Sequence, residues 1–246
     1  MYMTNQKKYW QTRSEKYDEL NWVSYPKWIS EIVTATEFDK NDLVLDVGTG
    51  TGIIAEALSF KVKSVIGIDF CEDMIKKSQY KDSVSFILRD IRDPLFNNEI
   101  FDKVTARMVF HHIIEDTQKA MDECYRVLKK GGKMILSESI PPSPEVKEDF
   151  VRIFSFKEER LTFLEEDLIK MMKNSGFKNI KINFHTMENF SVKNWLEKSG
   201  LSQKNQDKIF EMHVTNSETF KNAYNMKIIN GDCLIDVKNI ILVGEK

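Results

Sequence analysis

The sequence feature that most constrains the fold is an apolar run that passes directly into a glycine-rich turn, at residues 43–52 (Leu-Val-Leu-Asp-Val-Gly-Thr-Gly-Thr-Gly). A short, unbroken run of valine and leucine predicts a buried strand of a parallel sheet. Glycine at every second position after it removes side chains, so a ligand can approach the backbone closely. A helix that begins near Ile53 would point its free amide groups at that ligand. These features indicate a nucleotide-type site at the carboxyl edge of a parallel sheet.

Helical periodicity and short apolar runs alternate from about residue 26 to residue 140. This is the order of βα units that build a parallel sheet with helices on both faces, so the predicted class is α/β. A helix is expected from Lys27 to Phe38, with Pro26 well placed for its first turn. Strands are expected at 43–47, 64–68, 84–88, 103–106 and 133–138, with helices near 53–60, 72–80 and 117–129. The segment 129–132 (Lys-Lys-Gly-Gly) is interpreted as a helix end, where cations and a left-handed glycine are typical.

The pattern changes after Pro141-Pro142-Ser143-Pro144. Amphipathic stretches follow, including a helix at 164–174, then a strand at 180–184 and a helical region at 191–226. The last apolar run, 232–243, could pair beside the preceding strand. Two terminal strands separated by helices predict a lid inserted near the edge of the sheet.

Charge and cysteine content narrow the class of protein. Lysine and arginine total 36 against 38 acidic residues, so the net charge is −2, the pI is near 6.2, and no overall positive field attracts nucleic acid. The three cysteines are far apart and fit neither a disulfide framework nor a paired-cysteine metal site. No signal-peptide core and no run near the roughly 20 apolar residues of a membrane span is found. We therefore expect a soluble cytoplasmic protein without membrane or nucleic-acid partners.

The glycine turn matches one class of nucleotide loop better than others. The dinucleotide fingerprint G-x-G-x-x-G would need its third glycine at position 53, which is isoleucine. A phosphate-binding P-loop would need a following G-K-[ST], which this turn lacks. A dehydrogenase and a P-loop enzyme are therefore disfavoured. The remaining alternative is a tight glycine turn that binds no ligand.

An acidic residue followed by G-x-G-x-G resembles the first motif of the class I S-adenosylmethionine-dependent methyltransferases of the small-molecule, type 11-like group; here it comprises Asp46, Gly48, Thr49, Gly50 and Gly52. The segment Glu123–Gly132 is similar to the E-x-x-R-V-L-K-P-G-G segment of the same family, with Lys130 in place of the proline. The resemblance covers about residues 40–140. It implies S-adenosylmethionine as the cofactor and a Rossmann-like, doubly wound, mostly parallel seven-stranded sheet with an antiparallel last strand and a helical lid.

The next strand ends supply further expected cofactor contacts. Asp69 ends the run 65–68, where a carboxylate can accept both hydroxyls of a ribose, although it could instead cap the following helix. In the resembling family, the position of Met74 packs against the adenine and that of Asp90 accepts from its amino group. Met74 could equally be core and Asp90 surface. Phe70 and Ile91, beside these acidic residues, are included in the expected cofactor site.

The fourth expected strand ends in Arg107 and is soon followed by two histidines, His111 and His112. These histidines would lie beyond the carboxyl edge of the sheet, where the reacting sulfur is expected, and imidazole is suited to remove a proton near neutral pH. We hypothesise that one of them, with His112 slightly preferred, orients or deprotonates the acceptor, while Arg107 lines the cofactor site. Helix capping or packing under the lid is the alternative. A metal site that also uses Glu115 and Asp116 is not expected.

The N-terminal segment 9–17 looks like a helix that some relatives fold over the bound cofactor. Arg13 could meet the carboxylate of the cofactor, and Tyr9 or Tyr17 could face its sulfonium. An amphipathic helix that only covers the sheet explains the same pattern. Near the first lid helix, Arg152 and Arg160 are expected on a solvated helix face, and binding of an anionic acceptor is the alternative.

One domain, residues 1–246, is expected, with a cofactor-covering segment (1–25), a cofactor-binding core (26–142) and an acceptor-side lid with the terminal strands (143–246). The predicted function is methyl transfer to an oxygen, nitrogen or carbon atom of a small molecule, by a monomer or a homodimer. Two alternatives are open: a non-catalytic S-adenosylmethionine-binding partner or sensor, and methylation of a nucleic acid or protein side chain.

Overall fold

The computed structural model describes residues 9–11, 13–78 and 82–246. In this part of the chain, a twisted eight-stranded sheet has the order β3-β2-β1-β4-β5-β8-β6, with β7 paired to β8. The strands are β1 (Leu43–Val47), β2 (Ser64–Asp69), β3 (Val84–Leu88), β4 (Phe101–Arg107), β5 (Leu128–Ser139), β6 (Lys178–Ser191), β7 (Lys227–Ile229) and β8 (Asp232–Glu245). Strands β1 to β5 are mutually parallel, and β8 runs antiparallel to β5 and β6. The predicted fold class is confirmed.

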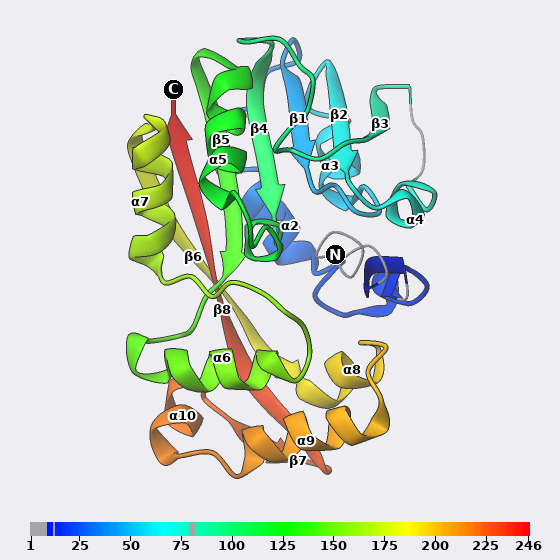
Figure 1. The fold of residues 1–246 in the computed structure, drawn as a ribbon, viewed down its shortest axis with the longest axis vertical. Helices are drawn as coiled ribbons and strands as arrows, with labels where there is room; N and C mark the ends of the chain where they lie inside the picture. The colour runs from blue at the N-terminus through cyan, green and yellow to red at the C-terminus, as the bar shows by residue number, and fades with distance from the viewer. Residues whose placement is uncertain (1–8, 12, 79–81) are drawn as a thin grey trace.

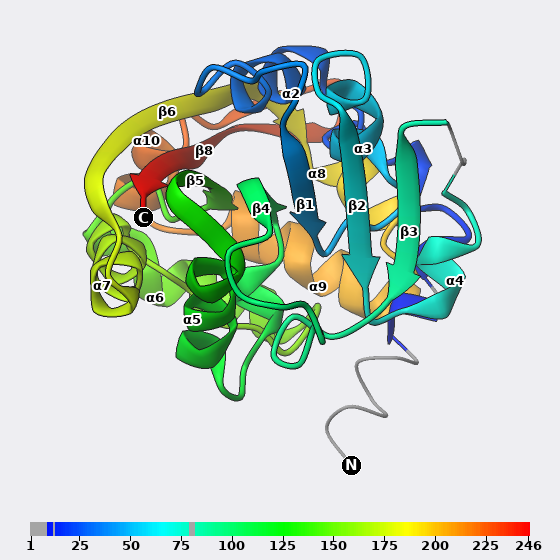
Figure 2. The same cartoon turned by 90° about the horizontal axis from the view of Figure 1, so that it is seen from above.

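Helices cover both faces of the sheet, and the alternation of side chains along β1 explains how (Figure 2). Val44 points to the face covered by α2 (Pro26–Ile32) and α3 (Ile53–Leu58). Leu45 and Val47 point to the opposite face, which is covered by α5 (Thr117–Val127) and α7 (Glu165–Ser175). Because β1 is buried on both faces, its run is continuously apolar apart from Asp46.

A second, smaller layer gathers around the far ends of β6 and β8 (Figure 1). These strands extend beyond β5, and four helices pack there, namely α6 (Lys147–Ser155), α8 (Val192–Glu197), α9 (Gln203–Val214) and α10 (Glu218–Ala223). Their core includes Phe150, Trp195, Ile209 and Phe220. The helical region predicted at 191–226 is thus three helices that form a lid. The helical residues 9–11 and 13–14 lie between the sheet and this lid.

Short elements complete the chain: η1 (Tyr17–Glu19), α4 (Glu72–Ile75), η2 (Phe110–His112) and η3 (Pro144–Val146). Predicted strand positions agree with the structure, although β5 and β6 are longer than expected. Helix α2 ends at Ile32 and not at Phe38, and α4 ends at Ile75. The remainder of the helix expected at 72–80 falls partly on residues 79–81, outside the described residues.

The interpretation of Lys129–Gly132 as a helix end is wrong. Helix α5 already ends at Val127, and residues 128–139 belong to β5. Gly131 does adopt a left-handed φ of 74°, but its amide donates to the backbone carbonyl of Lys246 at 2.9 Å. Lys129 forms an ion pair with Asp102 at 2.8 Å instead of neutralising a helix end. The glycine therefore shapes the start of a strand, where the chain end pairs with it.

Candidate active site

The glycine turn after β1 adopts a backbone conformation that only glycine takes readily. Gly48, Gly50 and Gly52 have φ angles of 61°, 57° and 89°. A Cβ atom on Gly52 would lie 2.7 Å from the Phe86 ring, and one on Gly48 would lie 2.3 Å from Cγ2 of Val109. The turn is therefore fixed both by its dihedral angles and by the side chains packed against it. It delivers the chain into α3, whose N-cap is Gly52.

Asp46 braces this turn from within the sheet. Its side chain is buried and accepts hydrogen bonds from the hydroxyls of Thr49 and Thr105, both at 2.7 Å. Burial raises the pKa of Asp46 to about 6, and the two hydroxyl hydrogen bonds oppose that rise. Because both carboxylate oxygens are engaged within the protein, Asp46 positions the turn.

Asp69, the last residue of β2, joins the turn to the next helix. One oxygen accepts from the amide of Gly50 at 3.0 Å and the other from the amide of Cys71 at 2.9 Å. Burial raises the pKa of Asp69 to about 6. The contact with the Cys71 amide corresponds to the alternative role of Asp69, capping of the following helix, that the sequence also allowed. Each oxygen keeps a second lone pair, so the carboxylate can still accept a ligand hydroxyl.

A cavity lies over these strand ends, and we call it the loop cavity. Its lining includes Gly48, Asp69, Phe70, Asp90 and Ile91, at the carboxyl ends of β1, β2 and β3. The predicted residues from separate strands are thus brought together. Met74 is buried nearby against Trp10 and Cys71 and does not line this cavity.

Asp90 already has a partner in the loop cavity. Its carboxylate pairs with the guanidinium of Arg92 at 2.6 Å and accepts from the Arg92 amide at 2.9 Å. Burial acts to raise the pKa of Asp90, but the hydrogen bonds from Arg92 outweigh it and the pKa lies below its usual value. The residue is therefore a fixed anion, with Arg92 holding it in place.

A narrow cleft on the other side of the turn is lined by Tyr17, Asp46, Gly48, Thr49 and Arg107, and we call it the arginine cleft. The Arg107 guanidinium donates to the backbone carbonyls of Val23 and Trp22 at 2.8 and 2.6 Å. Burial lowers the pKa of Arg107 to about 10, so it remains a cation at neutral pH. Burial raises the pKa of Tyr17 to about 12, so its hydroxyl stays neutral there.

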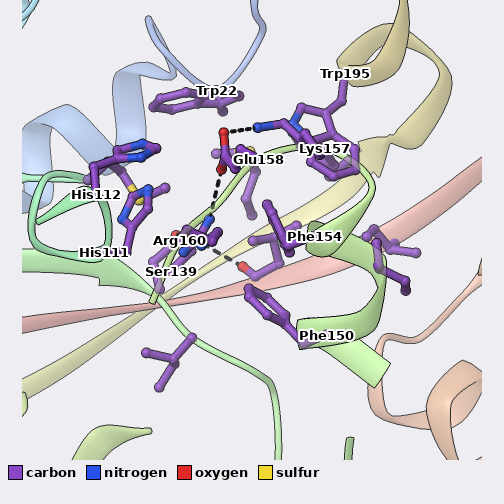
Figure 3. A pocket seen from close by; sticks show the side chains of 18 of the residues that line it. Trp22, His111, His112, Ser139, Phe150, Phe154, Lys157, Glu158, Arg160 and Trp195 are labelled. Atoms are coloured by element: carbon purple, nitrogen blue, oxygen red, sulfur yellow. Dashed lines mark hydrogen bonds and ion pairs between the residues drawn. The ribbon is translucent and has the colours of Figure 1, made fainter. Parts of the chain in front are cut away.

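A larger cavity, the aromatic cavity, separates the sheet from the lid. All four tryptophans of the chain line it, namely Trp10, Trp22, Trp28 and Trp195. Phe150 and Phe154 add further aromatic walls from α6 (Figure 3). Trp10, Met108 and His112 line both this cavity and the loop cavity. The two cavities therefore share a wall, which His112 and the N-terminal segment help to build.

His111 and His112 both line the aromatic cavity, and His111 is held by a buried carboxylate. Nδ1 of His111 lies 2.6 Å from Oε2 of Glu138, and Oε1 of Glu138 accepts from the amides of Val109 and Phe110. Burial lowers the pKa of His111 well below its usual value, with Arg160 adding to the effect. The ring is therefore neutral. A proton on Nδ1 donated to Glu138 leaves Nε2 as an acceptor.

His112 packs edge-to-face against Trp10, with ring centroids 4.7 Å apart, and its ring centroid lies 4.0 Å from that of His111. Burial, together with the neighbouring His111, lowers the pKa of His112 well below its usual value. The two rings therefore form a neutral imidazole pair in which His111 lines the aromatic cavity and His112 lines both cavities.

Opposite the histidines, one buried carboxylate meets three cations. Glu158 pairs with Lys157 and, at 3.5 Å, with Arg160 (Figure 3). It also pairs with Arg13 at 3.1 Å. The hydroxyl of Tyr9 also donates to Glu158 and accepts from Arg13. These four charged side chains are at most 4% exposed. Tyr9 and Arg13 thus tie the N-terminal segment to the lid, so their predicted cofactor contacts, which require a different arrangement, stay predictions.

Ligand atoms of His111, His112 and Glu158 lie within 4.8 Å of one another, a spacing that a metal ion could bridge. Glu115 and Asp116, which follow the histidines in the sequence and were the other candidate metal ligands, are both exposed. The carboxylate grouped with both histidines at this spacing is Glu158, which comes from a segment more than 40 residues further along the chain.

Three residues that matter here were not predicted: Glu138, Lys157 and Glu158. Glu138 could have been predicted from the sequence, because it is an acidic residue at the carboxyl end of the fifth predicted strand. Lys157 and Glu158 lie in an irregular segment between α6 and α7, where neither periodicity nor a motif distinguishes them from surface charges.

Several buried N–H groups lack a hydrogen-bond partner within the described residues, and three of them line these cavities: Nε1 of Trp10, Nε of Arg13 and Nε of Arg107. Unpaired buried donors are costly and point to a ligand that would complete them. A nucleoside with an amino-acid tail fits this arrangement, because carboxylates lie at two strand ends and an arginine lies in the cleft beyond the glycine turn. The residues present therefore fit S-adenosylmethionine.

Comparison with known proteins supports the same conclusion. Residues 45–136 match a family model described as a methyltransferase domain. A demethylmenaquinone methyltransferase of Symbiobacterium thermophilum is 33% identical over 143 residues, which cover 52% of this chain and 57% of that protein. One from Staphylococcus carnosus is 29% identical over 211 residues, covering 73% and 87%. The chain spans about half the length of the curated relatives that it matches first.

The fold has close counterparts among solved structures. The YcgJ protein from Bacillus subtilis superposes with a TM-score of 0.80 at 21% identity, covering 89% of this chain and 97% of that one. In the described part of the chain, no helix is long and apolar enough to cross a membrane. The predicted family and its cofactor, S-adenosylmethionine, are confirmed: the chain belongs to the class I S-adenosylmethionine-dependent methyltransferases.

Proposed function

We propose that this protein transfers a methyl group from S-adenosylmethionine to a small-molecule acceptor bound in the aromatic cavity. The observation that carries the proposal is the wall shared by the loop cavity and the aromatic cavity, built by Trp10, Met108 and His112. A cofactor on one side of this wall and an acceptor on the other would meet in a region shielded from water. Holding two reactants close and aligned is the main requirement of such a displacement.

The cofactor supplies a methyl group activated on a sulfonium and leaves as S-adenosylhomocysteine. Asp69 would accept from the ribose hydroxyls and Asp90 from the adenine amino group, while Phe70 and Ile91 would contact the base. Arg107, at the opposite end of the glycine turn, would pair with the cofactor's carboxylate, and Tyr17 in the same cleft would lie near its sulfur end. Asp46 and Thr49 keep the turn in shape.

An acceptor hydroxyl, amine or acidic carbon must lose a proton as the new bond to the methyl carbon forms. A neutral histidine can take that proton, and the contact between Glu138 and His111 fixes the imidazole in a suitable tautomer. We therefore assign the base role to His111, with His112 orienting the acceptor from the shared wall. This reverses the order of preference given by the sequence alone.

An aromatic or planar acceptor fits the cavity best, because its walls are tryptophan and phenylalanine side chains. Relatives named as demethylmenaquinone methyltransferases are consistent with a ring-containing substrate. The lid closes over this cavity, which disfavours a nucleic acid or a protein side chain as the acceptor. We also propose the predicted division into a covering segment (1–25), a cofactor core (26–142) and a lid (143–246) within one domain.

Calorimetric titration with S-adenosylhomocysteine tests the cofactor half of the proposal. We expect micromolar binding by the wild type, at least tenfold weaker binding by Asp69→Ala, and unchanged binding by Asp73→Ala, a control on the neighbouring helix α4. Release of S-adenosylhomocysteine in the presence of an acceptor then separates an enzyme from a non-catalytic sensor. Failure of the wild type to bind either S-adenosylmethionine or S-adenosylhomocysteine would sink the proposal.

A further inference from the structure

One end of the aromatic cavity is strongly charged, and we call it the charged pole. It comprises Arg13, Lys157, Glu158 and Arg160. Arg13, Lys157 and Arg160 converge on the single carboxylate of Glu158, and all four side chains are almost completely buried. Buried charges are normally matched, because an unmatched charge loses its hydration without compensation. Here three cations share one anion. The cluster therefore carries one surplus positive charge when Lys157 is neutral and two when Lys157 is protonated.

The other nearby carboxylate does not remove this surplus. Glu138 is bound by two backbone amides and by His111, and it does not line the cavity. Burial raises the pKa of Glu138 to about 7 although Arg160 opposes the rise, so Glu138 is only a partial counter-ion near neutral pH. Tyr9 is no better, because burial and Glu158 raise its pKa and keep it neutral.

The donors of the cluster also outnumber its acceptors. A lysine and two arginines carry many N–H groups, whereas one carboxylate offers about four lone-pair positions. Nε of Arg13 has no hydrogen-bond partner among the described residues. Arg160 reaches Glu158 only at 3.5 Å and lies over the Phe154 ring, 4.3 Å from its centroid. Further anionic oxygens at this pole would meet donors that are already in place.

A metal ion is a poor occupant of the same pole. His111, His112 and Glu158 have metal-like spacing, but a divalent cation there would lie beside Lys157, Arg13 and Arg160. Repulsion from three buried cations in a low-dielectric site works against it. The charge pattern favours an anion.

We propose that the acceptor carries an acidic group, a carboxylate or a phosphate, on a planar apolar body, and that Lys157 and Arg160 bind this group in competition with Glu158. The inference rests on the proposed function and names its substrate class. Phe150, Phe154 and Trp195 would contact the planar body (Figure 3). Because Glu158 lies within 4.8 Å of the histidine ligand atoms, the acidic group would be close to the atom that is methylated.

The cavity provides its own reporter of binding. All four tryptophans line it, so quenching of intrinsic fluorescence follows occupancy without turnover. We would titrate the full chain, with and without saturating S-adenosylhomocysteine, using two matched pairs of nitroaromatic quenchers. The pairs are 4-nitrobenzoate with 4-nitrobenzamide, and 4-nitrophenyl phosphate with 4-nitroanisole. We expect at least one anion to bind about tenfold or more tightly than its neutral partner, and the tighter pair tells a carboxylate from a phosphate.

Substitutions test whether the preference for anionic probes arises from the charged side chains around Glu158. Arg160→Gln is expected to remove most of the preference for the anion, whereas Arg152→Gln, an exposed arginine of α6 that pairs with Asp149, should leave it intact. Glu158→Gln removes the internal competitor and is expected to tighten anion binding, an outcome that a purely structural ion pair would not give. If Glu158→Gln does not fold, Lys157→Met provides the second test, with the same expected loss as Arg160→Gln.

Equal affinity for the anionic and neutral members of both pairs would overturn the inference, as would binding of neither pair or a preference that survives in Arg160→Gln. This failure is distinct from failure of the proposed function. In the first case S-adenosylhomocysteine still binds in the calorimeter, and in the second it does not.

Discussion

The loop cavity and the aromatic cavity share a wall, yet different parts of the chain build them in different ways. The loop cavity is made by residues that follow consecutive strands of the sheet, so each is fixed by its own strand and by backbone hydrogen bonds. The aromatic cavity is assembled from the N-terminal segment, the segment after α6 and the strands and helices of the lid. Only the first lies mainly within the residues matched by the family model, 45–136.

This difference separates the part of the site that lies within the matched family model from the part that lies mainly outside it. A cofactor common to many enzymes is held by a rigid sheet edge, as expected for parallel α/β folds. The aromatic cavity, which we propose holds the acceptor, is lined by side chains that meet across long separations, such as Arg13 and Glu158, 145 residues apart. Damage to the loop cavity should therefore abolish cofactor binding, whereas changes in the aromatic cavity should alter acceptor choice.

The largest effect is expected for Gly52→Ala. Its left-handed φ costs about 1–2 kcal/mol for a residue with a Cβ, and overlap with the Phe86 ring adds about 1–3 kcal/mol of overpacking. We expect chemical denaturation to show that both costs lower the free energy of unfolding. Calorimetry should show no S-adenosylhomocysteine binding. Gly131→Ala is the control, because Gly131 has a φ of 74° but no atom within 4 Å of a Cβ. Equal cofactor affinity in the two variants would contradict the role given to the turn.

The loop cavity was also the part that the sequence could predict. The strand at 43–47, the glycine turn and the acidic residues at the carboxyl ends of β2 and β3 are local patterns, and parallel strands bring these ends to one edge. The two histidines were placed beyond that edge for the same reason. What the sequence could not supply was Asp90's pairing with Arg92 and the support that Asp46 gives to Thr49.

The aromatic cavity could not be predicted, for a physical reason. Lys157 and Glu158 belong to an irregular segment, and adjacent charged residues in a sequence usually lie in solvent. Their burial depends on the N-terminal segment folding against them, a contact that carries no local signal. Arg160 was considered as an anion ligand only as a minor alternative, and its buried position strengthens that alternative over a solvated face.

The second prediction compares histidines within the aromatic cavity. Substitution of His111 with glutamine should lower kcat by about 10²–10⁴-fold, the range typical of a lost general base, with unchanged affinity for S-adenosylhomocysteine. His213 also lines the cavity, but its Nδ1 is bound to the carbonyl of Ile209 at 2.8 Å, so His213→Gln serves as the control. Single-turnover assays measure both. Full turnover in the double variant of His111 and His112 would rule out a base role for either.

The third prediction concerns the contribution of Glu158 to the free energy of unfolding. Glu158→Gln leaves three buried cations without their carboxylate, and we expect a loss of about 2–3 kcal/mol of unfolding free energy. Glu211→Gln on the exposed face of α9, where Glu211 pairs with Lys208, should cost less than about 0.5 kcal/mol. An anion that replaces the missing carboxylate should restore part of the lost thermal stability, because it binds only the folded state. An unchanged melting temperature with 4-nitrobenzoate and with 4-nitrophenyl phosphate would contradict this expectation.

The smallest expected effect is a pH dependence of acceptor affinity set by Lys157. Burial, reinforced by Arg13, lowers the pKa of Lys157 to about 7, while Glu158 opposes the shift. Below that pH the ammonium is present and binds an anion, and above it the anion loses one of its cations. We therefore expect the Kd of the anionic probe to rise about three- to tenfold between pH 6 and pH 8.5, and the Kd of the neutral probe to stay constant.

The other groups around Lys157 must be separated from this effect. Arg13 and Arg160 remain cations, Tyr9 remains neutral, and the pKa of Glu158 is held well below its usual value despite burial, chiefly by Lys157. The two histidines are neutral throughout, which leaves Glu138, with a pKa near 7, as the competing titration. Ionisation of Glu138 would weaken anion binding in the same direction. Lys157→Met distinguishes the two, because a pH step that persists in this variant belongs to Glu138, and one that disappears belongs to the lysine.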